Sequence, residues 1–240
     1  MMEYNDNMTI EHLVAALNYV TDMPTPTQSQ LEKFLLYNNI LLEYNQHINL
    51  TRIVTPVDVS QKHFADSLLP ISLIPYGAKC VDIGTGAGFP GIPLKIMRPD
   101  IQLTLVDSLA KRIKFLNRLC QSLSIDAVAI HARAEDAARQ PSLRCSFDVA
   151  LSRAVASTRI ITEITVPFLI RGGISLVYKT GNQDNEIAVA SNALAELRAE
   201  AYSKQYDVPW GNRTILIVRK KSDTPRLYPR RPSVVEKYPL

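Results

Sequence analysis

Three glycines that directly follow a short apolar segment are the clearest sign of a ligand site in this sequence of 240 residues. The apolar segment is Val81–Ile83, and the glycines are Gly84, Gly86 and Gly88. Glycine allows a tight turn and a close approach of the backbone to a ligand, because no Cβ atom intervenes. In open α/β sheets, ligands bind beyond the carboxyl ends of the strands. We therefore expect this turn to bind a nucleotide-type cofactor.

The spacing of the glycines separates two kinds of cofactor. The dinucleotide fingerprint G-x-G-x-x-G places its third glycine where this chain has Phe89. Asp107 ends the next strand pattern, and its carboxylate is placed to accept hydrogen bonds from ribose hydroxyls. NAD and S-adenosylmethionine both carry that ribose. The missing glycine and the acidic Asp82 ahead of the turn favour S-adenosylmethionine, which has no pyrophosphate.

Two further strand ends lie on the same side of the predicted sheet. Ala134 and Glu135 follow the third strand, and Ser152 and Arg153 end the fourth. These residues could face the cofactor, but each charged one also has an ordinary role. A carboxylate in the first turn of a helix is favoured by the helix dipole at the surface, and Arg153 could form a surface ion pair. The spacing alone leaves both roles open.

Short β-branched segments alternate with helical stretches from residue 80 onward. This alternation predicts an α/β fold in which parallel strands are joined by helical crossovers. The strand patterns cover 80–84, 101–107, 126–132, 147–152, 173–179 and 214–220. The helical patterns cover 93–97, 109–123, 158–169 and 185–201.

The residues before the first strand read as helices. Ile10–Leu17 has apolar residues at helical spacing, and Thr27 with Gln30 forms a capping box for a second helix. Thr55 followed by Pro56 is typical of another helix start, for a helix running to about residue 69. We expect three parts: a helical extension over 1–75, a cofactor-binding domain over 76–220 and a basic tail over 221–240.

Composition excludes several classes of protein. Hydrophobic residues make up 46% and charged residues 21% of the chain, which is typical of globular proteins. We find no stretch of apolar residues long enough for a membrane helix and no secretion signal, so we expect a cytosolic protein without a membrane partner. Cys80, Cys120 and Cys145 are too scattered for a zinc or redox pair, so we expect small packing residues and no metal.

The positive charge is concentrated at the end of the chain. The whole chain has a formal net charge of +4, whereas residues 219–240 carry +5, from seven basic and two acidic side chains. Prolines at 225, 229, 232 and 239 are expected to block helix and sheet and to keep Arg230 and Arg231 on an extended segment. Such a segment could lie along phosphates, or it could be a solvated and poorly ordered terminus.

Several segments taken together resemble one known family. They are Asn49-Leu50-Thr51, His63-Phe64-x-Asp66-Ser67-Leu68, the run from Asp82 to Pro93, Asp107-Ser108-Leu109-x-Lys111-Arg112, Arg133-Ala134-Glu135 and Ser152-Arg153-Ala154. They resemble the bacterial 16S rRNA guanine-N7 methyltransferases, the family of small-subunit rRNA methyltransferase G, also called glucose-inhibited division protein B. The likeness spans about residues 35–220. It also extends to the basic, proline-containing ending at 228–232.

The resemblance implies a fold, a cofactor and a substrate. The fold would be that of a Rossmann-like class I methyltransferase, with a mostly parallel seven-stranded sheet, helices on both faces and an N-terminal helical extension. The substrate would be N7 of one guanine, at conventional position 527, in the 16S rRNA of the small ribosomal subunit. We expect a monomer. Together with the glycine turn, the resemblance implies that S-adenosylmethionine contacts Gly84, Gly86, Gly88, Phe89, Asp107, Ala134, Glu135 and Arg153.

The chemistry of guanine N7 requires little from the protein. Its lone pair is free at neutral pH, so it can attack the sulfonium methyl in line without a general base, and rate enhancement should come from alignment. We therefore expect no catalytic acid or base. Arg153 and Lys179, at neighbouring strand ends, are positioning candidates that could offset RNA charge. His63 and Asp66, three residues apart on one helix face, are expected to form a structural or RNA-positioning pair.

Two other functions fit the same sequence features. A small-molecule or protein methyltransferase could use the same fold, because a fold does not determine the substrate. A ribosome-assembly protein could bind RNA on this fold without catalysis.

Overall fold

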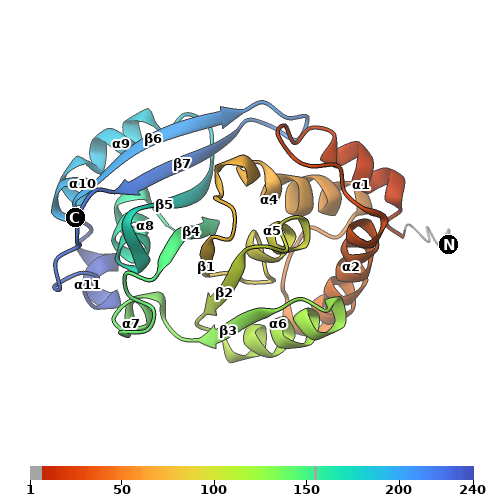
Figure 1. Ribbon diagram of the computed structural model, residues 1–240, viewed down its shortest axis with the longest axis horizontal. Helices are drawn as coiled ribbons and strands as arrows, with labels where there is room; N and C mark the ends of the chain where they lie inside the picture. Colours follow the sequence, from red (N-terminus) through yellow and green to blue (C-terminus); the bar gives the residue numbers. More distant parts are fainter. Residues whose placement is uncertain (1–6, 154–155) are drawn as a thin grey trace.

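A seven-stranded sheet forms the centre of the molecule in the computed structural model, which describes residues 7–153 and 156–240 (Figure 1). Ala154, the last residue of the Ser152-Arg153-Ala154 motif, lies outside the described residues. The strand order is β3-β2-β1-β4-β5-β7-β6. The strands are β1 (Lys79–Ile83), β2 (Gln102–Asp107), β3 (Ala127–His131), β4 (Phe147–Arg153), β5 (Leu169–Thr180), β6 (Ala199–Tyr206) and β7 (Arg213–Lys220).

The pairing confirms the predicted mostly parallel sheet. Strands β1 to β5 pair in parallel, whereas β7 runs antiparallel between β5 and β6. Because β1 and β4 lie side by side, the glycine turn after β1 and Arg153 at the end of β4 lie at the same edge. The first residue of β7, Arg213, pairs with Thr180 and is therefore brought to that edge as well.

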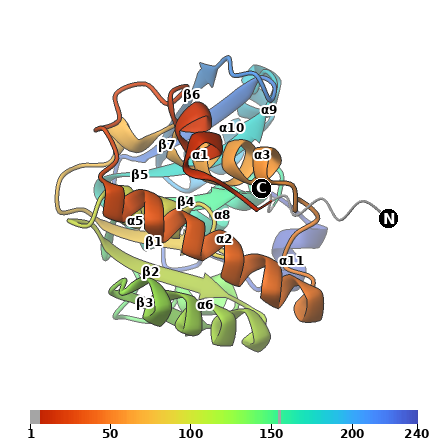
Figure 2. The same cartoon turned by 90° about the vertical axis from the view of Figure 1, so that its right-hand side faces the viewer.

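Helices cover both faces of the sheet, as Figures 1 and 2 show. On one face, the helices up to α6 share a core with the strands, and on the other face the helices from α7 to α10 pack in two smaller clusters. The helices are α1 (Ile10–Leu17), α2 (Gln28–Ile48), α3 (Pro56–Asp58), α4 (Asp66–Leu68), α5 (Gly91–Met97), α6 (Ala110–Leu123), α7 (Ala134–Ala137), α8 (Thr158–Thr165), α9 (Asp184–Val189), α10 (Ser191–Glu196) and α11 (Pro232–Lys237).

The N-terminal helices begin where the sequence predicts. Thr27 caps α2, since its hydroxyl accepts the Gln30 amide and the Gln30 side chain accepts the Thr27 amide. Pro56 occupies the first turn of α3, and a π-helical segment, Val59–Ala65, joins α3 to α4. Because these helices share one core with the sheet, the predicted division at residue 75 stays a prediction.

The helix predicted over 185–201 is wrong in its last part. The chain forms two short helices, α9 and α10, and then turns at Arg198, whose φ is +56°, into the edge strand β6. This strand has alternating half-buried and exposed residues and contains polar side chains, so it lacks the apolar pattern that identified the other six strands. The helix predicted over 158–169 also ends early, at Thr165, because Pro167 follows.

The prediction that prolines block helix in the tail is wrong, although Arg231, directly before α11, has the expected extended backbone. Pro232 is the first residue of helix α11. Proline is tolerated there because the backbone amides of the first helical turn make no hydrogen bond within the helix. Arg230 is not free to bind phosphate, since it forms an ion pair with Glu163, whose side chain is fully buried. The half-buried Arg144 guanidinium also donates to the carbonyls of Thr224 and Tyr228, so these contacts attach the tail to the domain.

The three cysteines differ in their surroundings. Cys80 and Cys120 are buried, as expected, and burial raises the pKa of their thiols to about 12 and about 11. Cys145 is exposed, so its predicted packing role is wrong. Over the described ranges there is no group of three or more His, Cys, Asp or Glu side chains that could hold a metal ion. In the same ranges, no helix is long and apolar enough to cross a membrane.

Candidate active site

The turn after β1 needs its glycines for two different reasons. Gly86 has φ +61°, a conformation that side-chain-bearing residues rarely adopt. Gly88 has φ +99°, and a Cβ there would lie 2.7 Å from Ile92 Cδ1 and 2.8 Å from the Tyr37 hydroxyl. Gly88 therefore faces α2 and α5 rather than a cavity, and the structure gives it a packing role in place of the expected cofactor contact.

Asp82 ties the two ends of the turn together from inside the sheet. Its fully buried carboxylate accepts the Thr85 hydroxyl at 2.7 Å and the Gly91 amide at 2.9 Å through one oxygen, while the other oxygen has no partner among the described residues. Burial raises the pKa of Asp82 to about 6, since the charged form loses its hydration. Asp82 is thus a structural residue of the turn.

We expect Asp82→Asn to remove part of the pH dependence of folding. Because the folded pKa is raised, the folded protein holds this proton more tightly than the unfolded chain between pH 3.8 and about 6, and wild-type stability falls as pH rises through that window. The asparagine oxygen accepts the same two donors but does not titrate. Urea unfolding at pH 4.5 and 7.5 should show the variant gaining about 2 kcal/mol relative to wild type at the higher pH. Parallel stability curves would contradict this.

Two cavities meet at Gly84, Asp107 and Ser108, at the carboxyl edge of β1 and β2. The first, here called the glycine-turn cavity, has a volume of about 420 Å³ and is lined by Leu50, Thr51, His63, Gly84–Ala87, Phe89, Asp107, Ser108, Arg112 and Arg153. The second, here called the Ala134 cavity, has a volume of about 410 Å³. It is lined mainly by apolar and small side chains, with Arg133, Glu135 and Glu236 at its polar parts. Seven of the eight predicted cofactor residues therefore line one or both cavities.

Asp107 lies between the two cavities and is largely occupied by the protein itself. One carboxylate oxygen accepts the Gly86 amide at 2.9 Å and Arg112 at 3.2 Å, and the other accepts the Leu109 amide at 2.9 Å. A carboxylate has about four acceptor positions. One acceptor position remains, so in this side-chain arrangement Asp107 can accept a hydrogen bond from one ribose hydroxyl.

Glu135 lies at the start of α7, as predicted, and lines the Ala134 cavity. It is buried rather than a surface carboxylate, which argues against its ordinary role at a helix start. Burial also raises its pKa, and the nearby Glu236 contributes in the same direction. The buried carboxylate is available as an acceptor for a ligand in this cavity.

Phe89 is held in an aromatic stack and is not free to stack on a ligand. Its ring lies parallel to Tyr37 at 5.1 Å and to His63 at 4.4 Å, with the Arg153 guanidinium 5.0 Å from its centroid. Tyr37, on α2, also donates to the carbonyl of Ala87 at 2.6 Å. The N-terminal extension therefore supports the glycine turn directly.

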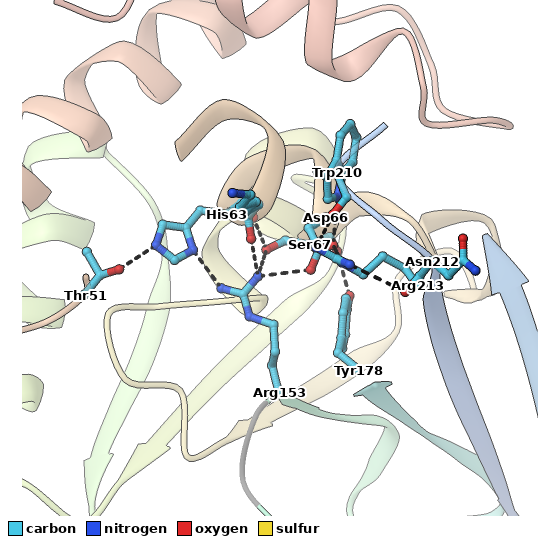
Figure 3. A network of polar contacts seen from close by, with 10 residues as sticks. Thr51, His63, Asp66, Ser67, Arg153, Tyr178, Trp210, Asn212 and Arg213 are labelled. Atoms are coloured by element: carbon cyan, nitrogen blue, oxygen red, sulfur yellow. Dashed lines mark hydrogen bonds and ion pairs between the residues drawn. The ribbon is translucent and has the colours of Figure 1, made fainter. Parts of the chain in front are cut away.

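Arg153 lies at the centre of a polar network that joins separate segments of the chain (Figure 3). Its guanidinium faces Asp66 at 3.5 Å, Ser67 at 3.4 Å and His63 Nδ1 at 3.4 Å. Asp66 in turn accepts Arg213 at 2.7 Å. The predicted alternative of a surface ion pair is wrong, because the side chains of Arg153 and Asp66 are only 15% and 8% exposed.

His63 is uncharged in this network. Desolvation by burial and the positive charge of Arg153 lower its pKa to about 3. Its other ring nitrogen, Nε2, lies 2.8 Å from the Thr51 hydroxyl. The spacing of His63 and Asp66 allowed a hydrogen bond between them, but the structure does not form it. Both side chains instead contact Arg153, from consecutive helical segments.

A third cavity adjoins the glycine-turn cavity and shares His63 and Arg153 with it. Its volume is about 660 Å³, and we call it the Lys179 cavity. Lys179 lies at the end of β5, donates to the Ala156 carbonyl at 2.9 Å and forms an ion pair with Glu186 at 3.1 Å. The structure thus brings both predicted positioning residues to one cavity. Its lining residues are Ile53, Lys62, His63, Asp66, Arg153, Ala156, Val177, Tyr178, Lys179, Thr180 and Arg213.

Several site residues were not identified as such from the sequence. Arg213 and Trp210 both donate to Asp66, and the Tyr178 hydroxyl donates to the Ser67 carbonyl at 2.6 Å. The place of Arg213 could have been predicted if the last strand had been recognised as antiparallel. The first residue of such a strand lies at the edge where the parallel strands end. Thr51 belongs to the Asn49-Leu50-Thr51 motif, and the motif alone does not indicate what its hydroxyl contacts.

Comparison with known proteins decides the family. The family model described as rRNA small subunit methyltransferase G matches residues 30–207. The chain belongs to this family. Its members include "Ribosomal RNA small subunit methyltransferase G" of Desulfitobacterium hafniense, 44% identical over 88% of this chain and 90% of the relative. The protein of the same name from Streptococcus thermophilus is 41% identical over 89% of this chain and 93% of the relative.

Solved structures show that this member of the rRNA small subunit methyltransferase G family has the class I methyltransferase fold. An O-methyltransferase from Bacillus cereus, solved in complex with SAH, has a TM-score of 0.56 and 19% identity, and the match covers 89% of this chain and all of that one. A methyltransferase from Pyrococcus furiosus has a TM-score of 0.52 and 15% identity over 81% of this chain and all of that one. At these identities, the likeness concerns the fold alone.

Proposed function

We propose that this protein transfers a methyl group from S-adenosylmethionine to N7 of one guanine, at conventional position 527, in 16S rRNA. The observation that carries the proposal is that a large cavity with cationic side chains adjoins the glycine-turn cavity and shares Arg153 and His63 with it. A base in one cavity would then face a methyl donor in the other. Membership of the rRNA methyltransferase family supports the choice of substrate.

The two smaller cavities suit the two ends of the cofactor. The Ala134 cavity has the apolar walls that a purine prefers, from Ile83, Val106 and Ile160, and its buried Glu135 could accept a nucleoside donor. The glycine-turn cavity contains Arg112 and Arg153, which suit a carboxylate. Gly84 and Asp107 belong to both cavities, where the ribose would lie. These residues fit S-adenosylmethionine, with Ala134 on the adenosine side and Phe89 behind the methionine side.

The reaction needs alignment more than proton transfer. S-adenosylmethionine supplies a methyl group on a sulfonium, so the bond from methyl carbon to N7 forms while the bond to sulfur breaks and its electron pair stays on sulfur. His63 contacts partners at both ring nitrogens, and Asp66 faces two guanidiniums. Neither is free to act as a base, which supports direct in-line attack by N7.

The pairing of the cations also suits this chemistry. Methyl transfer moves positive charge onto the guanine ring, so an unpaired cation beside the ring would oppose it. Arg153 faces Asp66, and Lys179 faces Glu186. Lys179 can therefore donate a hydrogen bond to the base or to RNA while Glu186 offsets its charge, whereas Arg153 shares Asp66 with Arg213.

Under this proposal the protein works in the cytosol as a monomer bound to the small ribosomal subunit or its RNA. Residues 1–75 then support the glycine turn and contribute Thr51 and His63 to the cavities, residues 76–220 contribute the other cofactor and base contacts, and residues 221–240 close the adenosine side through α11.

The test is methylation of small-subunit RNA by the purified protein. We expect labelled methyl from S-adenosylmethionine to enter 30S subunits or 16S rRNA from cells that lack this modification, and mass spectrometry of RNase fragments to show one N7-methylguanine at position 527. RNA with adenine at 527 is the matched control and should accept no label. Labelling of free metabolites or proteins in place of RNA would favour a different methyltransferase. Binding of RNA without any methyl transfer would favour an assembly factor.

A further inference from the structure

The direction of one hydrogen bond of the Thr51 hydroxyl decides whether its own hydrogen is left for a ligand. Its oxygen accepts the amide of Ile53 at 3.0 Å and lies 2.8 Å from His63 Nε2. Whether the hydroxyl donates to the imidazole or accepts from it depends on which ring nitrogen of His63 carries the proton. The position of that proton therefore decides what Thr51 can do.

A proton on Nε2 fits the contact that Arg153 makes with the other ring nitrogen of His63. A guanidinium only donates hydrogen bonds, and Arg153 Nη2 lies 3.4 Å from Nδ1. For this contact to be a hydrogen bond, Nδ1 has to be the unprotonated nitrogen of the neutral ring. Nε2 then carries the hydrogen and donates it to Thr51 (Figure 3). With its two acceptor positions filled, the Thr51 hydroxyl can only donate its own hydrogen.

The cavity beside Thr51 determines what would accept that hydrogen. Thr51 lines the glycine-turn cavity together with Arg112 and Arg153. Asp66 is the carboxylate shared by Arg153 and Arg213, so this cluster of three side chains carries a surplus of one positive charge. An anionic acceptor is therefore favoured there. Within the proposed function, on which this inference rests, the anionic group of the cofactor is the carboxylate of its methionine part.

We propose that Thr51 binds the cofactor carboxylate through its hydroxyl hydrogen, and that His63 orients this hydroxyl by donating from Nε2. Thr51 is then a cofactor-binding residue, and His63 is a positioning residue that acts through it. The Asn45 side chain fixes the segment, because its carbonyl oxygen accepts the amides of Leu50 and Thr51 at 2.7 and 2.8 Å. The donor is thus held in place before the cofactor binds.

The experiment is a cycle of two ligands and three proteins, measured by calorimetry. The ligands are S-adenosylhomocysteine and S-adenosyl-3-thiopropylamine, which is the same thioether without the carboxylate. Thr51→Val keeps the shape of the side chain but removes the hydroxyl, whereas Thr51→Ser keeps the hydroxyl. A hydrogen bond to a charged group corresponds to about a tenfold change in affinity or more. We expect Thr51→Val to weaken S-adenosylhomocysteine about tenfold and to leave the amine ligand within about twofold.

Thr51→Ser should bind both ligands like wild type. An equal loss of affinity for both ligands in Thr51→Val, or no loss for either, would overturn the role of Thr51. Nitrogen-15 NMR of His63 gives a second readout that a packing role would not determine: we expect a neutral ring protonated at Nε2, and a ring protonated at Nδ1 would overturn the assignment. A wild-type protein that binds neither ligand would instead overturn the proposed function.

Discussion

Replacing Arg153 by methionine should lower kcat/KM for methyl transfer about 100-fold, which corresponds to about 2.7 kcal/mol of lost transition-state stabilisation. Arg153 lines both the glycine-turn cavity and the Lys179 cavity, so under the proposed function the variant loses contacts to the cofactor and to the base. Methionine fills a similar volume but donates no hydrogen bond. Arg153→Lys should recover little, because a single ammonium does not reproduce the planar fork that faces Asp66, Ser67 and His63.

The loss of activity must be separated from a loss of folding. Removal of Arg153 leaves the Asp66 carboxylate with Arg213 and Trp210 as its remaining partners in the described network, so some destabilisation is expected. The Asp66–Arg213 ion pair stays balanced in charge in Arg153→Met, so urea unfolding should show a loss of stability that is small beside the loss of activity. Arg171→Met is the matched control, since Arg171 is exposed at the other end of β5. An Arg153→Met protein with more than a third of wild-type activity would contradict the central role of Arg153.

The cofactor side of the site was predictable because its signals are local. The turn at Gly84–Gly88 and the carboxylate of Asp107 follow directly after strands, so a pattern within about ten residues shows both the element and its ligand-facing end. Parallel pairing of β1 with β2 and β4 then brings Asp107 and Arg153 to one edge. Arg153 and Lys179 were found for the same reason, because their strands β4 and β5 are neighbours.

The substrate side was not predictable in detail, because its contacts join distant parts of the chain. Asp66 and Arg213 are 147 residues apart and meet only because β7 runs antiparallel to β5. Strand β6 was not predicted because it lacks an apolar pattern: an edge strand buries little surface and tolerates polar residues on both sides. The uncharged state of His63 follows from burial and from Arg153, and neither is visible in the spacing of His63 and Asp66.

The structure of the C-terminal tail was also not predictable, because it depends on a contact with a distant part of the chain. Its charge and prolines describe a solvated segment when the tail is considered alone. The partner of Arg230 is Glu163 on α8, a residue 67 positions earlier. The side chain of Glu163 is fully buried, so it requires a cation, and the tail supplies that cation. A charged residue in a basic tail can therefore be a structural residue of the domain.

Arg230→Met should destabilise the protein by about 3–5 kcal/mol, because it leaves a buried carboxylate without its partner. Arg230 makes three hydrogen bonds to Glu163, from its backbone amide at 2.8 Å and from its guanidinium at 2.9 and 2.6 Å. Only the amide bond would remain in the variant. The free energy of unfolding in urea measures the effect. Arg226→Met is the matched control, since Arg226 is exposed on the same tail, and it should change stability by less than about 0.5 kcal/mol.

Three further measurements on Arg230→Met show whether the lost stability comes from the unpaired Glu163 charge or from lost packing of the tail. Detachment of the tail would hydrate Glu163 while the sheet stays folded, so limited trypsin digestion should cut Arg230→Met near Arg226 much faster than wild type. Since Glu236 of α11 lines the Ala134 cavity, detachment should also weaken S-adenosylhomocysteine binding. The double variant Glu163→Met with Arg230→Met removes both charges and should recover most of the stability, because paired apolar side chains often replace a buried ion pair at little cost. If the double variant is no more stable than Arg230→Met, the buried charge is not the cause and the tail is held by its other contacts, from Arg144 and Tyr228.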